Sequence, residues 1–162
     1  MNRRLRRAEK AKNKKTSRTQ ADPTATNPAA ERDFAEAMRL HQAGQSEEAR
    51  TYYRRVLRTQ PNHSVSLHHL GVIALQFGKS EDAVDYIRKA VRAQPVYPFA
   101  HNNLGNALRN VGRLEDAEAS YSTAISQKPD YAEAHYNLGN ALEEVNQYEK
   151  SINSYNNSIK LK

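Results

Sequence analysis

The 162-residue sequence contains no cysteine, which excludes disulfide bonds and thiolate metal sites. No run of 18 apolar residues occurs in it, so we predict no membrane-spanning segment. The basic start of the chain is not followed by an apolar stretch, and this argues against a secretory signal. We therefore expect a chain without disulfide bonds and without a membrane span.

The motifs of common catalytic sites are also missing. The chain has no Gly-x-Ser-x-Gly elbow, no P-loop and no His-Glu-x-x-His pair, and no strand pattern interrupts its helical periodicity. Six histidines are present, but His68 and His69 are adjacent and diverge by about 100° on a helix. We therefore predict no catalytic residues, no metal site and no cofactor.

The basic charge of the chain is confined to its start. The formal net charge is +7, yet residues 1–20 hold nine Lys or Arg and one acid, a net of +8. Residues 21–162 hold the remaining 16 bases and 17 acids, a net of −1. The positive balance therefore describes a tail, while the body of the protein is nearly neutral.

Residues 1–29 are predicted to be a disordered basic tail followed by a Thr/Pro/Ala linker that starts at residue 21. Apart from Met1, Leu5 is the only apolar side chain larger than alanine in the first 20 residues, so the tail cannot bury enough surface to fold alone. Three roles stay open for it. The tail is a solvated segment that keeps the protein soluble, or it binds a polyanion such as RNA, the ribosome or lipid head groups, or it is a nuclear localisation signal.

A 34-residue period runs through the rest of the chain. Residues 103–108, NLGNAL, recur as residues 137–142. Proline recurs at this spacing at Pro61, Pro95 and Pro129. Glycine does the same, with one asparagine in its place, at Gly44, Gly78, Gly112 and Asn146. The chain is therefore a tandem array of similar units.

Each unit is predicted to be a pair of helices. In the unit 98–131, apolar residues recur at three- and four-residue spacing over about 100–110 and again from Leu114 to Ile125. Gly112 lies just past the first helix, where a positive φ is often required, and Asn146 is the next best residue for that conformation. Pro129 cannot continue the second helix. Gly105 is expected where the two helices approach closely, because a larger side chain would overpack the contact.

These spaced positions resemble the signature of the tetratricopeptide repeat (TPR) family. The resemblance implies an all-α solenoid of helix-turn-helix hairpins, about four repeats wound into a right-handed superhelix. We expect a degenerate first repeat at 30–63, further repeats at 64–97 and 98–131, and an incomplete fourth at 132–162. In the fourth repeat Ile152, Tyr155 and Ile159 are left without a successor to pack on, so either the chain continues, or a partner or a second copy covers them.

The resemblance also implies that extended peptides bind on the concave face, which the first helix of each repeat lines. The candidate peptide-binding residues are Phe34, Met38, His68, His69, Val72, Asn102, Asn103, Asn106, Arg109, Asn110, Tyr136, Asn137 and Asn140. Along this face the side chains change from apolar and imidazole to carboxamide. Asparagine offers both a donor and an acceptor, so a row of asparagines can bind a peptide backbone of any sequence. The alternative is that these amides bridge neighbouring helices.

Within the TPR family, the repeats resemble those of one class of protein and differ from those of another. Asn103 and Asn137 look like the asparagine ladder of O-linked N-acetylglucosamine transferases, and the repeats resemble the N-terminal TPR region of bacterial SPINDLY-type proteins. The chaperone-tail-binding TPR domains, by contrast, need Lys or Arg where this chain has Phe34, His68 and Phe99. We therefore expect a cytoplasmic, non-catalytic scaffold that binds a protein segment. The alternatives are the substrate-recognition region of a glycosyltransferase, and polyanion binding through the tail.

Overall fold

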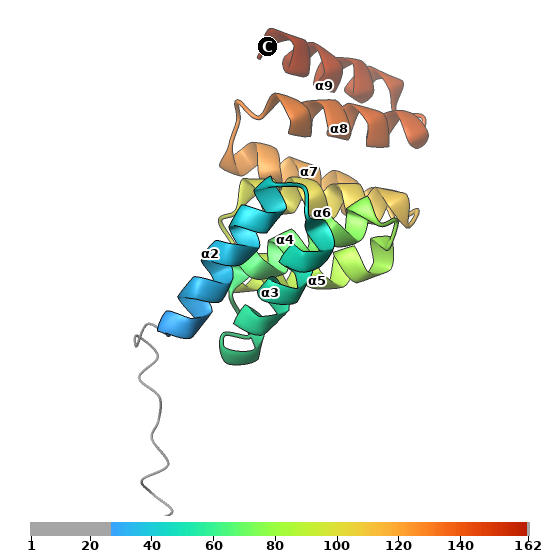
Figure 1. Cartoon of the computed structure of the whole chain (residues 1–162). Helices are drawn as coiled ribbons and strands as arrows, with labels where there is room; N and C mark the ends of the chain where they lie inside the picture. Colours follow the sequence, from blue (N-terminus) through green and yellow to red (C-terminus); the bar gives the residue numbers. More distant parts are fainter. Residues whose placement is uncertain (1–26, 162) are drawn as a thin grey trace, which may run out of the picture.

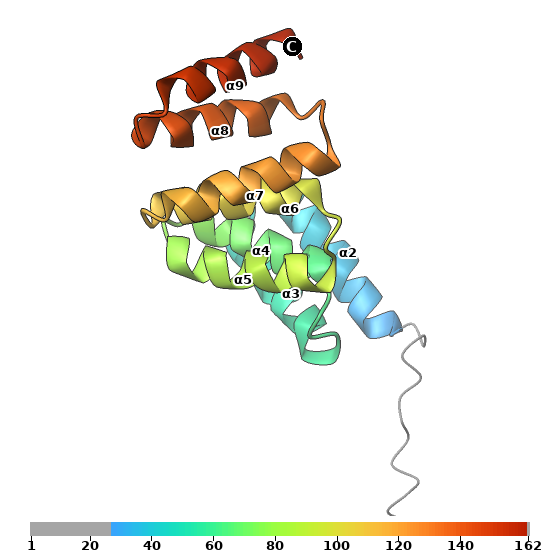
Figure 2. The same ribbon diagram turned by 180° about the vertical axis from the view of Figure 1, so that it is seen from behind.

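A computed structural model describes residues 27–161, which form eight α-helices (Figure 1). The expectations for residues 1–26 lie outside the described part of the chain. The helices pair into four antiparallel hairpins, stacked in chain order from α2 to α9 (Figures 1 and 2). Their bounds are α2 Pro28–Gln42, α3 Ser46–Thr59, α4 Ser64–Gln76, α5 Ser80–Ala93, α6 Pro98–Asn110, α7 Leu114–Gln127, α8 Ala132–Glu144 and α9 Tyr148–Lys160. The predicted all-α solenoid of helix-turn-helix hairpins is confirmed.

The turn inside each hairpin has the conformation that the sequence predicts. Gly112 has φ of 75° and Asn146 has φ of 60°, both in the left-handed region. The amide of Gly112 donates to the Arg109 carbonyl, and the next amide, that of Arg113, donates to the Leu108 carbonyl. This pattern is a Schellman motif, which satisfies carbonyls that the end of the helix leaves free. The same pair of bonds closes all four hairpins.

The two helices of a hairpin meet closely where the first one has glycine. A Cβ built on Gly105 would lie 2.5 Å from the Tyr121 ring, and one on Gly139 would lie 2.5 Å from the Tyr155 ring. The large residue of the second helix therefore packs directly on the backbone of the first. Tyr155 packs against Gly139 of its own hairpin but is only half-buried, whereas its counterpart Tyr121 is fully buried.

The first hairpin starts two residues before the expected boundary at residue 30. Asn27 caps α2 through its Oδ1, which accepts from the amides of Ala29 (3.1 Å) and Ala30 (3.3 Å). Pro28 follows at the first helical position, where its missing N–H has no partner to lose. The last two residues of the expected linker are therefore helical.

Each hairpin packs on the next mainly through its second helix, as α5 does on α6 and α7 on α8, and the first helices make smaller contacts with one another. α6 contacts both α4 and α8, the first helices of its two neighbours, in addition to its own partner α7. Because α4, α6 and α8 contact one another across hairpins and the second helices make no comparable contacts, the stack curves with its first helices, α2, α4, α6 and α8, on the inner side. This inner surface, defined by the exposed sides of these four helices, is where the candidate residues were predicted.

The far end of the stack exposes apolar side chains on α9. Ile152 is 58% exposed and Ile159 is 69% exposed, as the sequence predicts for these two residues. In the earlier hairpins the counterparts of Ile159, such as Ile125, are half-buried because the next hairpin covers them. None of the described helices is both long and apolar enough to cross a bilayer.

Candidate functional site

The inner surface brings the predicted residues together, but three of them lie mostly beneath it. Asn102 is fully buried, His68 is 6% exposed and Asn137 is 9% exposed. The other candidates are half-buried or exposed, among them Tyr136, half of whose surface is open. Asn102, His68 and Asn137 therefore need an explanation as interior groups.

Asn102 and Asn137 form a bridge between the third and fourth hairpins. Nδ2 of Asn137 donates to Oδ1 of Asn102 at 3.0 Å. Nδ2 of Asn102 in turn donates to Oε1 of Glu133 at 3.1 Å and to the hydroxyl of Tyr131 at 3.3 Å. A carboxylate can only accept, so Glu133 fixes the orientation of both amides. The bridging interpretation, which the sequence left open, describes this pair.

His68 and Asn103 form the equivalent bridge one repeat earlier. Nδ2 of Asn103 lies 2.9 Å from Nε2 of His68, and the other ring nitrogen lies 2.9 Å from the Tyr97 hydroxyl. An amide nitrogen only donates, so Nε2 of His68 carries the lone pair and the ring is neutral. Burial, together with the nearby His41, lowers the pKa of His68 to about 4, which is consistent with a neutral ring at pH 7.

The bridging amides keep one atom for solvent. Oδ1 of Asn103 and Oδ1 of Asn137 have no hydrogen-bond partner within residues 27–161. Neither oxygen is among the enclosed polar atoms that lack a partner, so both remain accessible. The two asparagines therefore join hairpins through their nitrogens and can still accept a hydrogen bond from a ligand.

Asn106 and Asn140 lie one helical turn further along α6 and α8. The Tyr121 hydroxyl lies 2.8 Å from Oδ1 of Asn106, and the Tyr155 hydroxyl lies 2.8 Å from Oδ1 of Asn140. A tyrosine of the second helix thus holds each amide in place. In the first hairpin Met38 takes this position, and its sulfur lies 3.2 Å from the Tyr53 hydroxyl.

The first two hairpins carry an aromatic and imidazole cluster in place of amides. His69 stacks on Tyr53 at 5.2 Å between ring centroids and lies 4.8 Å from His41. Burial lowers the pKa of His69 to about 4 and also lowers that of His41. Phe34 packs edge-on against His63 at 4.8 Å. This cluster of rings is therefore uncharged at neutral pH.

Charge is found on the other half. Arg109 of α6 pairs with Glu144 of α8, with 3.1 Å between Nε and Oε1. Glu143 and Asn110 are exposed beside them. The surface therefore changes from aromatic through carboxamide to acidic along the stack.

Sequence reasoning missed the tyrosine hydroxyls and Glu133. Tyr97 and Tyr131 are 34 residues apart, which could have marked them as one repeated position. Each bonds a buried group 29 residues earlier in the chain, and each buried group bonds an asparagine 35 residues later. Such spacings join neighbouring hairpins and leave no pattern within a single helix.

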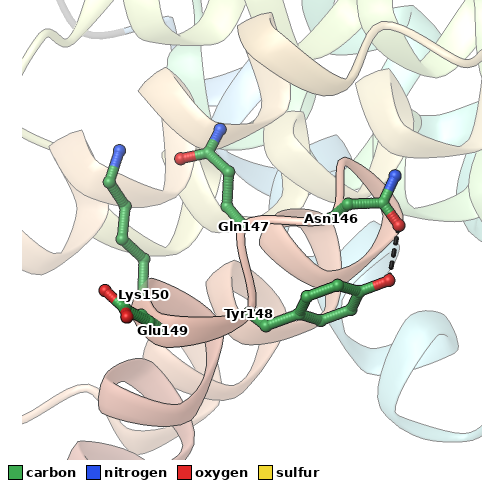
Figure 3. A pocket seen from close by; sticks show the side chains of 5 residues that line it. All are labelled: Asn146, Gln147, Tyr148, Glu149 and Lys150. Carbon is green, nitrogen blue, oxygen red and sulfur yellow. Dashed lines mark hydrogen bonds between the residues drawn. The ribbon is translucent and has the colours of Figure 1, made fainter.

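The remaining histidines and the pocket beside the last turn add no site. His101 and His135 are half-buried and bond the carbonyls of Pro95 (2.9 Å) and Pro129 (3.0 Å), which ties each first helix to the preceding turn. No group of three or more ligating side chains is placed to hold a metal within residues 27–161. A pocket of about 340 Å³ is lined by residues 146–150 (Figure 3), all from one turn, so it brings no distant residues together.

Solved structures similar to this chain are repeat proteins. MamA is 24% identical, with a TM-score of 0.76, and the match covers 82% of this chain and 73% of MamA. YrrB, described as a TPR protein with an unusual peptide-binding site, is 22% identical, with a TM-score of 0.74, over 83% of this chain and 69% of YrrB. These two likenesses show the fold alone.

A bacterial glycosyltransferase is also similar. The O-GlcNAc transferase of Thermobaculum terrenum, solved as a K341M mutant, is 30% identical with a TM-score of 0.67. The match covers 73% of this chain but only 23% of the transferase. No curated protein matches the sequence.

Family models match the repeats directly. Tetratricopeptide repeat models match residues 34–98 and 132–162, and a TPR repeat model matches residues 105–146. Together these matches span most of the described helices, in agreement with the four stacked hairpins and the left-handed turn residues. The chain belongs to the tetratricopeptide repeat family.

Proposed function

We propose that the protein is a non-catalytic scaffold that binds an extended protein segment along its inner surface. Family membership supports this proposal, because TPR domains bind protein and peptide partners. The observation that carries it is the set of four asparagines on α6 and α8, each held by an internal hydrogen bond. Side chains fixed in this way lose little conformational entropy when they bind a ligand.

The chemistry of these asparagines suits a peptide backbone. Asn103 and Asn137 have accessible oxygens without partners, and Asn106 and Asn140 each use one end of the amide on a tyrosine. An extended backbone presents N–H and C=O groups along each edge, so it can bond such a row whatever its side chains are. Phe34, Met38 and Val72 offer apolar contacts at the other end of the surface.

Binding of arrayed peptides tests this function. The full chain is applied to immobilised random dodecapeptides in 0.5 M NaCl, which screens contacts made by the basic tail. The double variant Asn106→Ala, Asn140→Ala removes two ligand hydrogen bonds and is expected to bind about tenfold more weakly or worse, at 0.5–1.5 kcal/mol per bond.

The matched control replaces two exposed asparagines of α9, Asn153→Ala and Asn156→Ala, and should bind like the unaltered chain. Both double variants should keep their helical circular dichroism. Asn103 and Asn137 are less suitable for this test because their nitrogens join hairpins. Equal binding by the two double variants would contradict the proposal.

The second candidate function is presentation of a protein substrate to a glycosyltransferase. It is favoured by the 30% identity with the O-GlcNAc transferase, of which the match covers 23%. The test is the DNA that follows the codon for Lys162. A reading frame that continues into alternating strand and helix patterns would support this candidate, and a stop codon at that point would contradict it.

A further inference from the structure

Asn106 and Asn140 occupy the same repeat position and meet the same kind of tyrosine, but they differ in one neighbour. Three residues further along the helix, α6 has Arg109 and α8 has Glu143. An arginine only donates hydrogen bonds and a carboxylate only accepts them. This single difference decides which end of each asparagine faces solvent.

On α6, the arginine fixes the direction of the bonds. The charge of Arg109 opposes the effect of burial, which raises the pKa of Tyr121 to about 12. The Tyr121 hydroxyl has no carboxylate partner in the described part of the chain, and a nearby cation favours its lone pairs, so its proton points to Oδ1 of Asn106, 2.8 Å away. Nδ2 of Asn106 has no partner in the described part of the chain, so this amide presents a donor.

On α8, the carboxylate reverses the direction. The Tyr155 hydroxyl lies 2.7 Å from Oε2 of Glu143 and 2.8 Å from the Asn140 amide, but it has a single proton. A hydrogen bond to an ionised acceptor is roughly twice as strong as a neutral one, so the proton goes to Glu143. The hydroxyl then has only lone pairs left for Asn140.

The two ends of a carboxamide have nearly the same size and shape, so Asn140 can turn by 180° without new space. Turned in this way, its nitrogen donates to Tyr155 and its oxygen faces solvent. Without the turn, Oδ1 of Asn140 would face an oxygen that has no proton to give it.

We infer that the residue at this position of each repeat sets the polarity of the neighbouring asparagine, so that Asn106 presents a donor and Asn140 presents an acceptor. Because the Asn103 and Asn137 oxygens are also free, α6 then offers one acceptor and one donor, whereas α8 offers two acceptors. This inference rests on the proposed binding of a peptide and adds to it the chemistry of the ligand.

A single residue of an extended peptide supplies one N–H and one C=O, which matches α6. On α8 the same residue leaves one of the two acceptors without a donor, and a basic side chain of the peptide can supply it. Glu143 is exposed beside them. On the same helix Tyr136 is half exposed, so a cation can lie over the face of its ring. The segment bound over α8 therefore carries a lysine or arginine.

Amide exchange of the free protein tests the polarity without any ligand. In NMR of the full chain, the side-chain NH2 of Asn140, bonded to Tyr155, should exchange with water at least tenfold more slowly than that of Asn106. Glu143→Arg gives the fourth hairpin the arginine that the third has at this position and should abolish the difference. The control Glu149→Arg changes the same charge on α9 and should preserve it. Equal exchange in the unaltered protein would overturn the inferred polarity.

Peptide selection then tests the ligand chemistry. Dodecapeptides selected from a random library by the full chain should be enriched in Lys or Arg. Replacing that residue by norleucine or citrulline should weaken binding at least tenfold for the unaltered chain and for Glu149→Arg, but less than twofold for Glu143→Arg. Selected peptides without a basic residue would refute this inference and leave the proposed function standing. A library from which no peptide is selected would refute both.

Discussion

At the scale of single residues, the absence of a side chain matters as much as its presence. Gly105 lets the Tyr121 ring rest on the backbone of α6, and the ring is fully buried. Its hydroxyl is also fixed by a hydrogen bond to Asn106. The ring therefore cannot move aside without breaking the bonds that orient the inner surface.

We predict that Gly105→Ala destabilises the protein. The new Cβ would lie 2.5 Å from a ring carbon, well inside contact distance, and overpacking of this kind typically costs about 1–3 kcal/mol. Urea denaturation followed by circular dichroism measures the loss. Asn110→Ala, on the exposed end of the same helix, is the control and should stay within about 0.5 kcal/mol of the unaltered chain. A Gly105→Ala protein as stable as that control would show that the hairpin has room to relax.

The buried imidazoles of His68 and His69 lead to a second prediction, that the stability of the protein depends on pH. The pKa values of His68 and His69 are about 4 in the folded protein and near 6.5 in an unfolded chain, so the folded state binds fewer protons between these values. The contribution of these histidines to the free energy of unfolding should therefore be complete above pH 6.5 and decrease as the pH falls towards 4. Each histidine contributes at most about 1.4 kcal/mol per pH unit.

The urea midpoint measured from pH 7.5 to pH 4.5 checks this dependence. Carboxylates also begin to titrate at the acidic end, so the comparison is with the variant His68→Asn, His69→Gln. The groups that face the pair are His41 of α2, Tyr53 of α3, Tyr97 and Asn103. A variant whose midpoint falls as steeply as that of the unaltered chain would assign the dependence to other groups.

At the scale of elements, the positions of helices and turns could be predicted from the sequence. Whether an individual asparagine side chain is buried could not. Gly112 and Asn146 mark the turns because few residues tolerate a positive φ, and this constraint acts within a few residues of chain. Asn102 gave no such signal. A polar asparagine on a helix is normally expected at the surface. Asn102 is buried because Tyr131, Glu133 and Asn137, which come later in the chain, hydrogen-bond its side chain.

The exposed face of α9 supports a prediction about association. Ile152 and Ile159 are largely open to solvent, and association of two copies through this helix remains a prediction from the sequence. If it occurs, the variant Ile152→Lys, Ile159→Lys should sediment as a monomer at concentrations where the unaltered chain does not. Its urea midpoint should be unchanged, because surface substitutions usually alter stability by less than about 0.5 kcal/mol. Identical sedimentation of both proteins would exclude association through these residues.

At the scale of the whole molecule, the stack varies along its length. The inner surface is aromatic and neutral over α2 and α4, carboxamide over α6, and acidic over the C-terminal end of α8. A segment that lies along it therefore meets a different chemistry at each hairpin. Because every repeat has nearly the same backbone, this order is set by side chains at only a few positions of the first helix.

Stability should also vary along the stack, since a repeat array behaves as a row of units coupled to their nearest neighbours. The fourth hairpin has Ser151 and Ser158 where the third has Ala117 and Ala124. Ser158 is 2% exposed, and its hydroxyl makes no hydrogen bond in the described part of the chain. We therefore expect amides of α8 and α9 to exchange faster than those of α4 to α7 in native-state hydrogen exchange.

Ser158→Ala should raise the free energy of opening of α8 and α9 by about 0.5 kcal/mol, because alanine is the better helix former. Amides of α4 and α5 should be unaffected, since they do not adjoin the fourth hairpin. A change of equal size in all four hairpins would mean that the molecule opens as one cooperative unit and not repeat by repeat.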